Sequence, residues 1–63
     1  MLQDVFNSDL LPGDVLLGGV EIVSVKPTLS SDVVEVMYRW PDGDLRIHHW
    51  PAYGMRVIFT RLG

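Results

Sequence analysis

Apolar and polar residues alternate with a period of two along much of this chain, most clearly in VVEVMYRW at 33–40 and MRVIFTR at 55–61. Successive side chains of a β-strand point to opposite faces, so this period is typical of strands in a sheet. β-branched residues are frequent in the same segments, which also favours strands. The pattern predicts five strands, at residues 15–17, 20–26, 32–40, 45–50 and 55–61.

Turn-forming residues separate these segments. Pro12-Gly13 leads into the first predicted strand, and Gly18-Gly19 permits a tight hairpin or a sharp bend because glycine adopts positive φ angles. Pro27 ends the second strand because proline cannot donate to a ladder, and Pro-Asp-Gly-Asp at 41–44 joins the third strand to the fourth. Short strands with such turns predict an all-β fold, either a small five-stranded barrel or a strongly bent antiparallel sheet.

The N-terminal segment is the only candidate for a helix. Residues 2–11 carry apolar side chains at a helix-like spacing, but the segment is polar, short and ended by Pro12-Gly13. We therefore expect at most one short helical turn there. Since no repeat, low-complexity tract or linker divides the chain, residues 1–63 are expected to form a single domain.

The register of the hairpin around 41–44 decides which side chains are buried. A two- or four-residue turn pairs Trp40 with Leu45 and gives one wholly apolar face, whereas a three-residue loop with a glycine bulge shifts the pairing by one. The shifted register places Arg46 and His48 among the aromatic side chains, so we favour the first. The apolar face is then Val34, Val36, Tyr38, Trp40, Leu45 and Ile47.

The opposite face in the favoured register is the candidate site. It places Trp50 beside arginine and methionine, a composition typical of binding hot spots, and makes Trp40 the core tryptophan. In the alternative, Trp50 folds over the open end of the barrel as a lid on the core, with Pro51 and Tyr53. The predicted binding residues are Trp50, Arg39, Arg46, Met37 and His48, with Arg56 and Ile58 of the last strand at the edge.

The sequence contains no motif that indicates a catalytic site or a metal site. His48 and His49 are adjacent on a predicted strand, so they point to opposite faces and cannot bind one metal together. Of the two, His49 is expected to face the core as a neutral, hydrogen-bonded side chain, and His48 to be exposed. The serines and threonines lie in no nucleophile motif, and Gly18-Gly19 lacks the following helix of a phosphate-binding loop. We expect no catalytic residue, no metal site, no cofactor and no enzyme activity.

Composition and charge limit the classes of molecule that this chain is expected to bind. With 48% hydrophobic residues the chain should fold, and with no cysteine its core must supply the stability. Residues 1–35 carry a net charge of −5 and residues 36–63 carry +2, an asymmetry that can orient the molecule toward a partner or a second copy. The net charge of −3 disfavours duplex DNA as a partner. The chain has no membrane-spanning run and no basic region at its start, so we expect a soluble, cytoplasmic protein.

The motifs resemble those of small SH3-like barrels: LLPGDVLLGGVEIVSV with its Pro-Gly-Asp entry, then VVEVMYRWPDGDLRIHHWPAYGMRVI with its hairpin around Asp-Gly. They are also similar to short uncharacterised β proteins of actinobacterial bacteriophages, in which PGD near the start and a PDG hairpin recur. The likeness covers about residues 10–60. It implies a phage accessory protein that acts in the host cytoplasm by binding, and it supplies no functional residue.

Three functions follow as hypotheses. The first is a non-enzymatic protein-interaction module that binds a host or phage protein and forms a homodimer through the contact face or an exposed strand edge. The second is a single-stranded nucleic-acid binder, which stacks bases on aromatic side chains in a basic groove, although the overall acidity counts against it. The third is a structural subunit of a phage particle.

Overall fold

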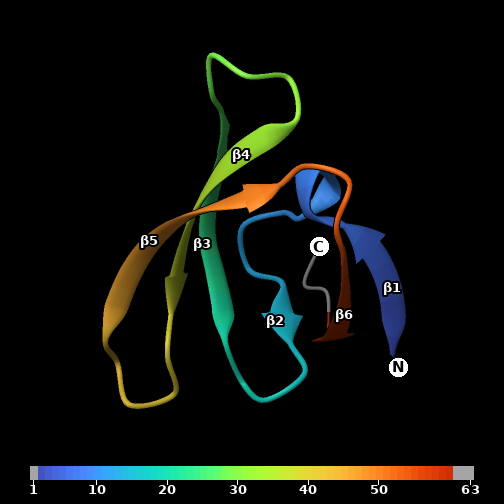
Figure 1. Cartoon of the computed structure of the whole chain (residues 1–63). Coiled ribbons are helices and arrows are strands. Elements are labelled where there is room, and N and C mark those ends of the chain that lie inside the picture. The colour runs from blue at the N-terminus through green and yellow to red at the C-terminus, as the bar shows by residue number, and fades with distance from the viewer. Residues whose placement is uncertain (1, 61–63) are drawn as a thin grey trace.

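The computed structural model describes residues 2–60, with side chains up to residue 55 (Figure 1). Within residues 2–60 the chain forms six strands and one 3-10 turn. All paired strands are antiparallel, and the order across the sheet is β1-β6-β2-β3-β4-β5. The elements are β1 Gln3–Phe6, η1 Asn7–Asp9, β2 Val15–Leu16, β3 Glu21–Pro27, β4 Val33–Arg39, β5 Leu45–Pro51 and β6 Met55–Thr60.

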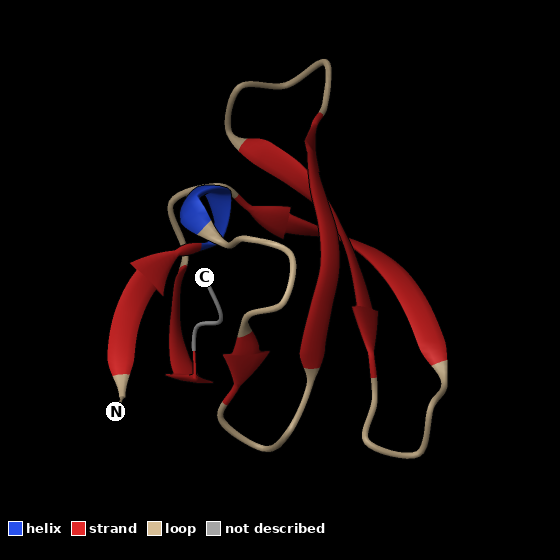
Figure 2. Cartoon of the chain, turned by 180° about the vertical axis from the view of Figure 1, so that it is seen from behind, coloured by secondary structure: helices blue, strands red, loops and turns tan. Residues whose placement is uncertain are grey.

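The fold is all-β with one short helical turn, as predicted, and its sheet is strongly curled (Figure 1). Figures 1 and 2 show β5 curving away from β3 and β4 and ending beside η1. Two backbone hydrogen bonds join η1 to the corner between β5 and β6: Asn7 N–H donates to Gly54 C=O at 2.8 Å, and Ser8 N–H donates to Ala52 C=O at 2.9 Å. The curled sheet is thus a half-barrel held at this corner.

The first strand was not predicted. β1 pairs with β6, with Val5 opposite Arg56. β1 is only four residues long, and it is held by a partner about fifty positions away, so its alternation is too short to distinguish from one turn of helix. The 3-10 turn η1 lies where the helical turn was expected.

The register predicted for the β4–β5 hairpin is wrong. Trp40 N–H donates to Asp44 C=O and Gly43 N–H donates to Trp40 C=O, both at 2.8 Å, and Gly43 has a φ of 93°. This is the three-residue loop with a glycine bulge, and it places Tyr38 opposite Arg46. The turn residues explain the choice, because Pro41 suits a turn position with negative φ and Gly43 takes the positive φ of the bulge.

The core lies on one face of the curled sheet, here called the inner face. It contains Ile22 of β3 and Val36 of β4, both fully buried, and Tyr38 beside them. The other members are Val5, Leu10, Leu16, Val34 and Ala52.

Three residues predicted to be in the core are half exposed instead. Trp40 is 42% exposed, and Leu45 and Ile47 are 51% and 53% exposed. The register shift turns Leu45 and Ile47 onto the opposite, outer face of β5. Because β5 is an edge strand, an inner face that carries Arg46 does not have to bury that charge.

The Pro-Gly-Asp motif forms a closed turn before β2. Asp14 N–H donates to Leu11 C=O at 3.0 Å, and the Asp14 carboxylate accepts the Leu11 N–H at 2.8 Å. Gly13 supplies the positive φ of 94° that this turn needs. The buried Asp14 therefore fixes the direction in which the chain enters the sheet.

Candidate binding pocket

An open pocket of about 390 Å³ lies on the inner face, between the turn after β2 and the strands β4 and β5. Apolar and aromatic side chains and one glycine form its lining. The volume is within the range of ~300–1,000 Å³ typical of small-molecule sites and is large enough for one bulky side chain. The lining residues of this aromatic pocket are Leu16, Leu17, Gly18, Val20, Tyr38, Trp40 and Trp50.

Two turns form one end of the aromatic pocket. Gly19 N–H donates to Leu16 C=O at 3.0 Å and Leu16 N–H donates to Val20 C=O at 2.7 Å, so Gly18-Gly19 is the tight bend predicted from the sequence. A Cβ atom added to Gly19 would lie 3.2 Å from Cγ of Pro41. The turn after β2 therefore contacts the β4–β5 loop, and it places Leu17 and Gly18 near Trp40.

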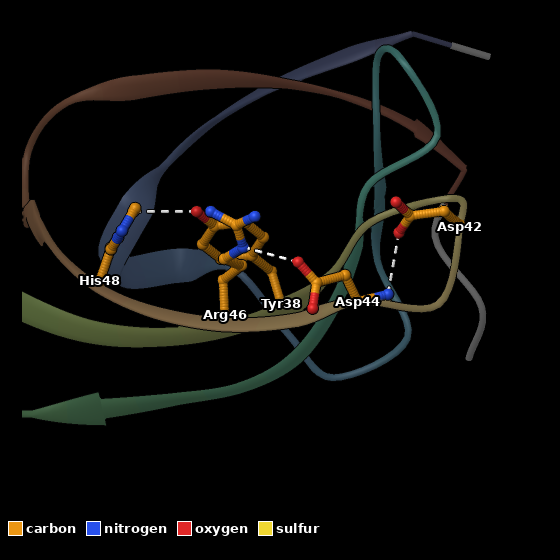
Figure 3. Close-up of polar contacts among 5 residues, drawn as sticks. All are labelled: Tyr38, Asp42, Asp44, Arg46 and His48. Atoms are coloured by element: carbon orange, nitrogen blue, oxygen red, sulfur yellow. Dashed lines mark hydrogen bonds and ion pairs between the residues drawn. The ribbon is translucent and has the colours of Figure 1, made fainter.

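Tyr38 organises the aromatic side chains. Its ring centre lies 5.9 Å from that of Trp40, at an interplanar angle of 72°, and 5.3 Å from that of Trp50, at 30°. The Tyr38 hydroxyl shares a hydrogen bond with Nδ1 of His48 at 2.8 Å (Figure 3). Tyr38 is buried and held at both its ring and its hydroxyl, whereas the neighbouring Trp40 remains half exposed.

A polar group borders this aromatic cluster on β5. Arg46 lies opposite Tyr38, and its Nε donates to Oδ2 of Asp44 at 2.8 Å (Figure 3). This side-chain hydrogen bond, together with the negative charge of Asp44, raises the pKa of Arg46 above its already high ordinary value. Oδ1 of Asp42 accepts the Asp44 N–H at 2.9 Å, which also orders the loop. The guanidinium is therefore charged and paired at neutral pH.

The structure does not bring the predicted contact residues onto one face. The register pairs Tyr38 with Arg46 and Met37 with Ile47, which puts Arg46 on the inner face and Met37 on the outer face. Because side chains alternate between the faces along a strand, His48 and Trp50 lie on the inner face with Arg46. Arg39 lies on the outer face with Met37. The side chains of Arg56 and Ile58 lie outside the described residues, and their strand β6 pairs with β1 and β2 rather than with β5.

Trp50 is partly buried and packs against the core. This is the placement expected of the lid alternative, and it leaves Trp40 as the more exposed tryptophan of the pocket. Sequence reasoning missed Trp40, Leu17 and Val20 as candidate site residues because it relied on the wrong register. The combination of Pro41 with Gly43 two positions later was the signal that could have corrected it.

The two histidines point to opposite faces and His48 is exposed, both as predicted, but His49 is exposed as well. His48 lies on the inner face with Tyr38, whereas His49 lies on the outer face with its Nε2 atom 3.6 Å from Oε2 of Glu35. The expectation that His49 faces the core is therefore wrong, for the same reason of register. Among the described residues, no group of three or more His, Cys, Asp or Glu side chains is arranged to hold a metal ion.

A second hollow, of about 290 Å³, lies beside the loop between β3 and β4. Polar side chains form much of its lining, among them Lys26, Thr28 and Ser30. The Thr28 hydroxyl is already used within the loop, since it donates to C=O of Ser30 and Val33, both at 2.9 Å. The aromatic pocket, in which the rings of Trp40 and Trp50 contact the buried ring of Tyr38, is the stronger candidate for a binding site.

Comparison with models of known protein families, with curated proteins and with solved structures finds no match for this chain. Within the described part of the chain, no helix has the length and apolar character to cross a membrane.

Proposed function

We propose that this chain is a non-enzymatic protein-interaction module whose aromatic pocket accepts an apolar side chain from a segment of a partner protein. The observation that carries the proposal is an open pocket, lined by apolar and aromatic residues, in which the half-exposed Trp40 lies beside the buried Tyr38. A tryptophan that is half exposed within a pocket lined by apolar side chains is available for a partner.

The area available on Trp40 is sufficient for a binding hot spot. A tryptophan side chain presents ~250 Å² at most, so the 42% exposure of Trp40 leaves roughly 100 Å² for a partner to cover. At about 25 cal/mol per Å², covering it contributes about 2.5 kcal/mol to binding. Residues above about 2 kcal/mol dominate protein interfaces, and tryptophan is enriched among them.

The surroundings of the pocket also suit a protein partner. An apolar centre with polar groups around it is the usual arrangement of a protein interface, and here Arg46, paired with Asp44, lies opposite the pocket residue Tyr38. The pairing of Arg46 with Asp44 argues against a nucleic acid, because phosphate binding needs unneutralised basic groups. The resemblance to phage accessory proteins adds the proposal that the partner is a host or phage protein in the host cytoplasm.

A peptide selection tests the proposed function. A display library of random 12-residue peptides would be selected on the immobilised wild-type protein, on Trp40→Ala and on Leu29→Ala, which changes a fully exposed loop residue as a control. We expect wild type and Leu29→Ala to enrich the same peptides, with a shared apolar anchor. Trp40→Ala should bind them at least about tenfold more weakly, since each 1.4 kcal/mol is a factor of ten.

Two outcomes would refute this function. One is the absence of enriched peptides on the wild-type protein. The other is an enriched peptide that binds Trp40→Ala as tightly as wild type, while circular dichroism shows that the variant keeps its fold. A single-stranded oligonucleotide, titrated at two salt concentrations, tests the nucleic-acid alternative, for which we expect no binding even at low salt.

A further inference from the structure

One edge of β5 has no strand beside it in the described part of the chain. Within residues 2–60, β5 lies at the end of the sheet and has β4 as its only strand neighbour. Two hydrogen bonds fix which backbone groups face β4: Trp40 N–H donates to Asp44 C=O at 2.8 Å, and Ala52 N–H donates to Asp32 C=O at 2.7 Å. The direction alternates along an antiparallel strand, so the even-numbered residues of β5 use their backbone groups toward β4.

The odd-numbered residues of β5 therefore direct their backbone groups outward. Leu45, Ile47 and His49 each present an N–H donor and a C=O acceptor at this edge. The three residues are spaced symmetrically about Ile47, so the edge is complementary to itself when a second β5 runs in the opposite direction. A second copy therefore offers a matching set of donors and acceptors over the same length of strand, as a two-fold symmetric dimer requires.

The side chains protect this edge only in part, since Arg46 is an inward-pointing charge but its charge is paired with Asp44. Proteins usually block exposed edges with lysine, proline, bulges or very short strands. β5 is seven residues long, and it contains no lysine or glycine and no proline before Pro51 at its end. Leu45 and Ile47 are half exposed on the outer face, and Met37 of β4 lies opposite Ile47. Pairing with another β5 would continue this apolar strip across the junction.

We propose that two copies of this chain pair antiparallel through β5, with Ile47 opposite Ile47 of the second copy and Leu45 opposite His49 of the second copy. In this register all three outward-facing residues of each copy find a partner. Arg46, whose charge is paired with Asp44, then lies opposite His48 of the second copy. A register centred on Arg46 would place two guanidinium groups opposite each other, and a register centred on His48 would use Pro51, which has no N–H.

The dimer uses a different surface from the aromatic pocket and does not depend on the proposed function. A single strand pair buries less than the ~1,200 Å² typical of stable complexes, so we expect reversible association at concentrations on the order of 10 μM to 1 mM. Sedimentation velocity over this range should show the wild type moving from monomer to dimer. Trp40→Ala should show the same change, because Trp40 lies in the pocket and not at the edge.

Single cysteines test the register directly, because the chain contains no cysteine. Ile47→Cys, Leu45→Cys and His49→Cys place one thiol each on the same face of the same strand. In the proposed dimer the two copies of position 47 have Cα atoms ~5.5 Å apart, within the ~4.4–6.8 Å that a disulfide spans. Two copies of position 45, or of position 49, are separated by four residues along the strand, about 13 Å, which is out of reach.

Under mild oxidation, Ile47→Cys should therefore form a covalent dimer at least about tenfold faster than Leu45→Cys and His49→Cys at equal concentration. Ile47→Lys should remain monomeric by sedimentation, while Leu29→Lys, its control in an exposed loop, should dimerise like wild type. The proposal is overturned if the wild type stays monomeric to 1 mM, or if the three cysteine variants cross-link at equal rates. A dimer that persists in Ile47→Lys would assign the interface to another surface.

Discussion

Replacing Asn7 with aspartate tests the contact that holds the half-barrel at its corner. Asn7 is buried, with 1% of its surface exposed, and its Nδ2 donates to the C=O of Pro51 at 2.8 Å. Its backbone N–H also donates to the C=O of Gly54. Asn7→Asp keeps the shape of the side chain but replaces the donor with an oxygen, which then faces the Pro51 carbonyl oxygen.

The expected cost follows from the burial of these groups. Leaving a buried polar group unsatisfied costs about 1–3 kcal/mol, and more if the new group is charged. At roughly 0.05–0.15 kcal/mol per residue, the whole domain has a stability of only about 3–9 kcal/mol. Each kcal/mol lost lowers the melting temperature by about 4–8 °C in a domain of this size, so Asn7→Asp should show a large shift at pH 7.

The dependence on pH identifies the cause. Burial beside a carbonyl oxygen raises the pKa of the introduced carboxyl in the folded state above its unfolded value of about 3.9. The folded state then binds a proton more readily than the unfolded state, so the stability of Asn7→Asp falls as pH rises through that interval. Below it, the protonated acid can donate to Pro51 again, and the deficit relative to wild type should shrink.

The assay is urea unfolding of wild type, Asn7→Asp and Asn7→Ala at pH 7 and at pH 4.5. Asn7→Ala loses the same donor but introduces no ionisable group, so its deficit relative to wild type should be the same at both pH values. If Asn7→Asp were as stable as wild type at pH 7, or if its deficit did not differ between the two pH values, the reasoning would be refuted.

Three further substitutions test the packing. Gly54→Ala places a Cβ atom 2.9 Å from Nδ2 of Asn7 and should destabilise the fold by about 1–3 kcal/mol, but by less in an Asn7→Ala background, as a double-mutant cycle would show. Tyr38→Phe removes the hydroxyl bonded to His48 and should cost about 0.5–1.5 kcal/mol in urea unfolding, and no cost in a His48→Ala background. Ile22→Ala, at a fully buried position, should cost about 2–5 kcal/mol and lower the melting temperature followed by circular dichroism by at least about 8 °C.

The sequence was informative where the fold depends on local chemistry. Alternation located β3, β4 and β5, and the bends at Gly13 and Gly18 followed from the positive φ angles that glycine supplies. The strand β1 could not be found in the same way. Its four residues are extended because they pair with β6 at the other end of the chain, and no local pattern records that pairing.

The candidate site was harder to predict because it depends on one register. The prediction gave priority to an uninterrupted apolar face, which is a sound criterion for a strand covered on both edges. β5 is an edge strand, where Arg46 can lie on the inner face and still reach water. The turn residues Pro41 and Gly43 indicate the three-residue loop, and with it the register that the structure has. A one-residue slip placed His48 on the inner face, beside Tyr38, and His49 on the outer face, beside Glu35.

The most direct test of the account is nuclear magnetic resonance of the ¹⁵N-labelled protein during titration with a peptide selected on it. The chain has two tryptophans, so each indole N–H gives its own resonance. Binding in the aromatic pocket predicts shifts of both indole signals, with the larger at Trp40, and of the Leu17 and Gly18 amides. Shifts confined to the hollow around Thr28 and Ser30, with both indole signals unchanged, would contradict the assignment of the aromatic pocket as the binding site.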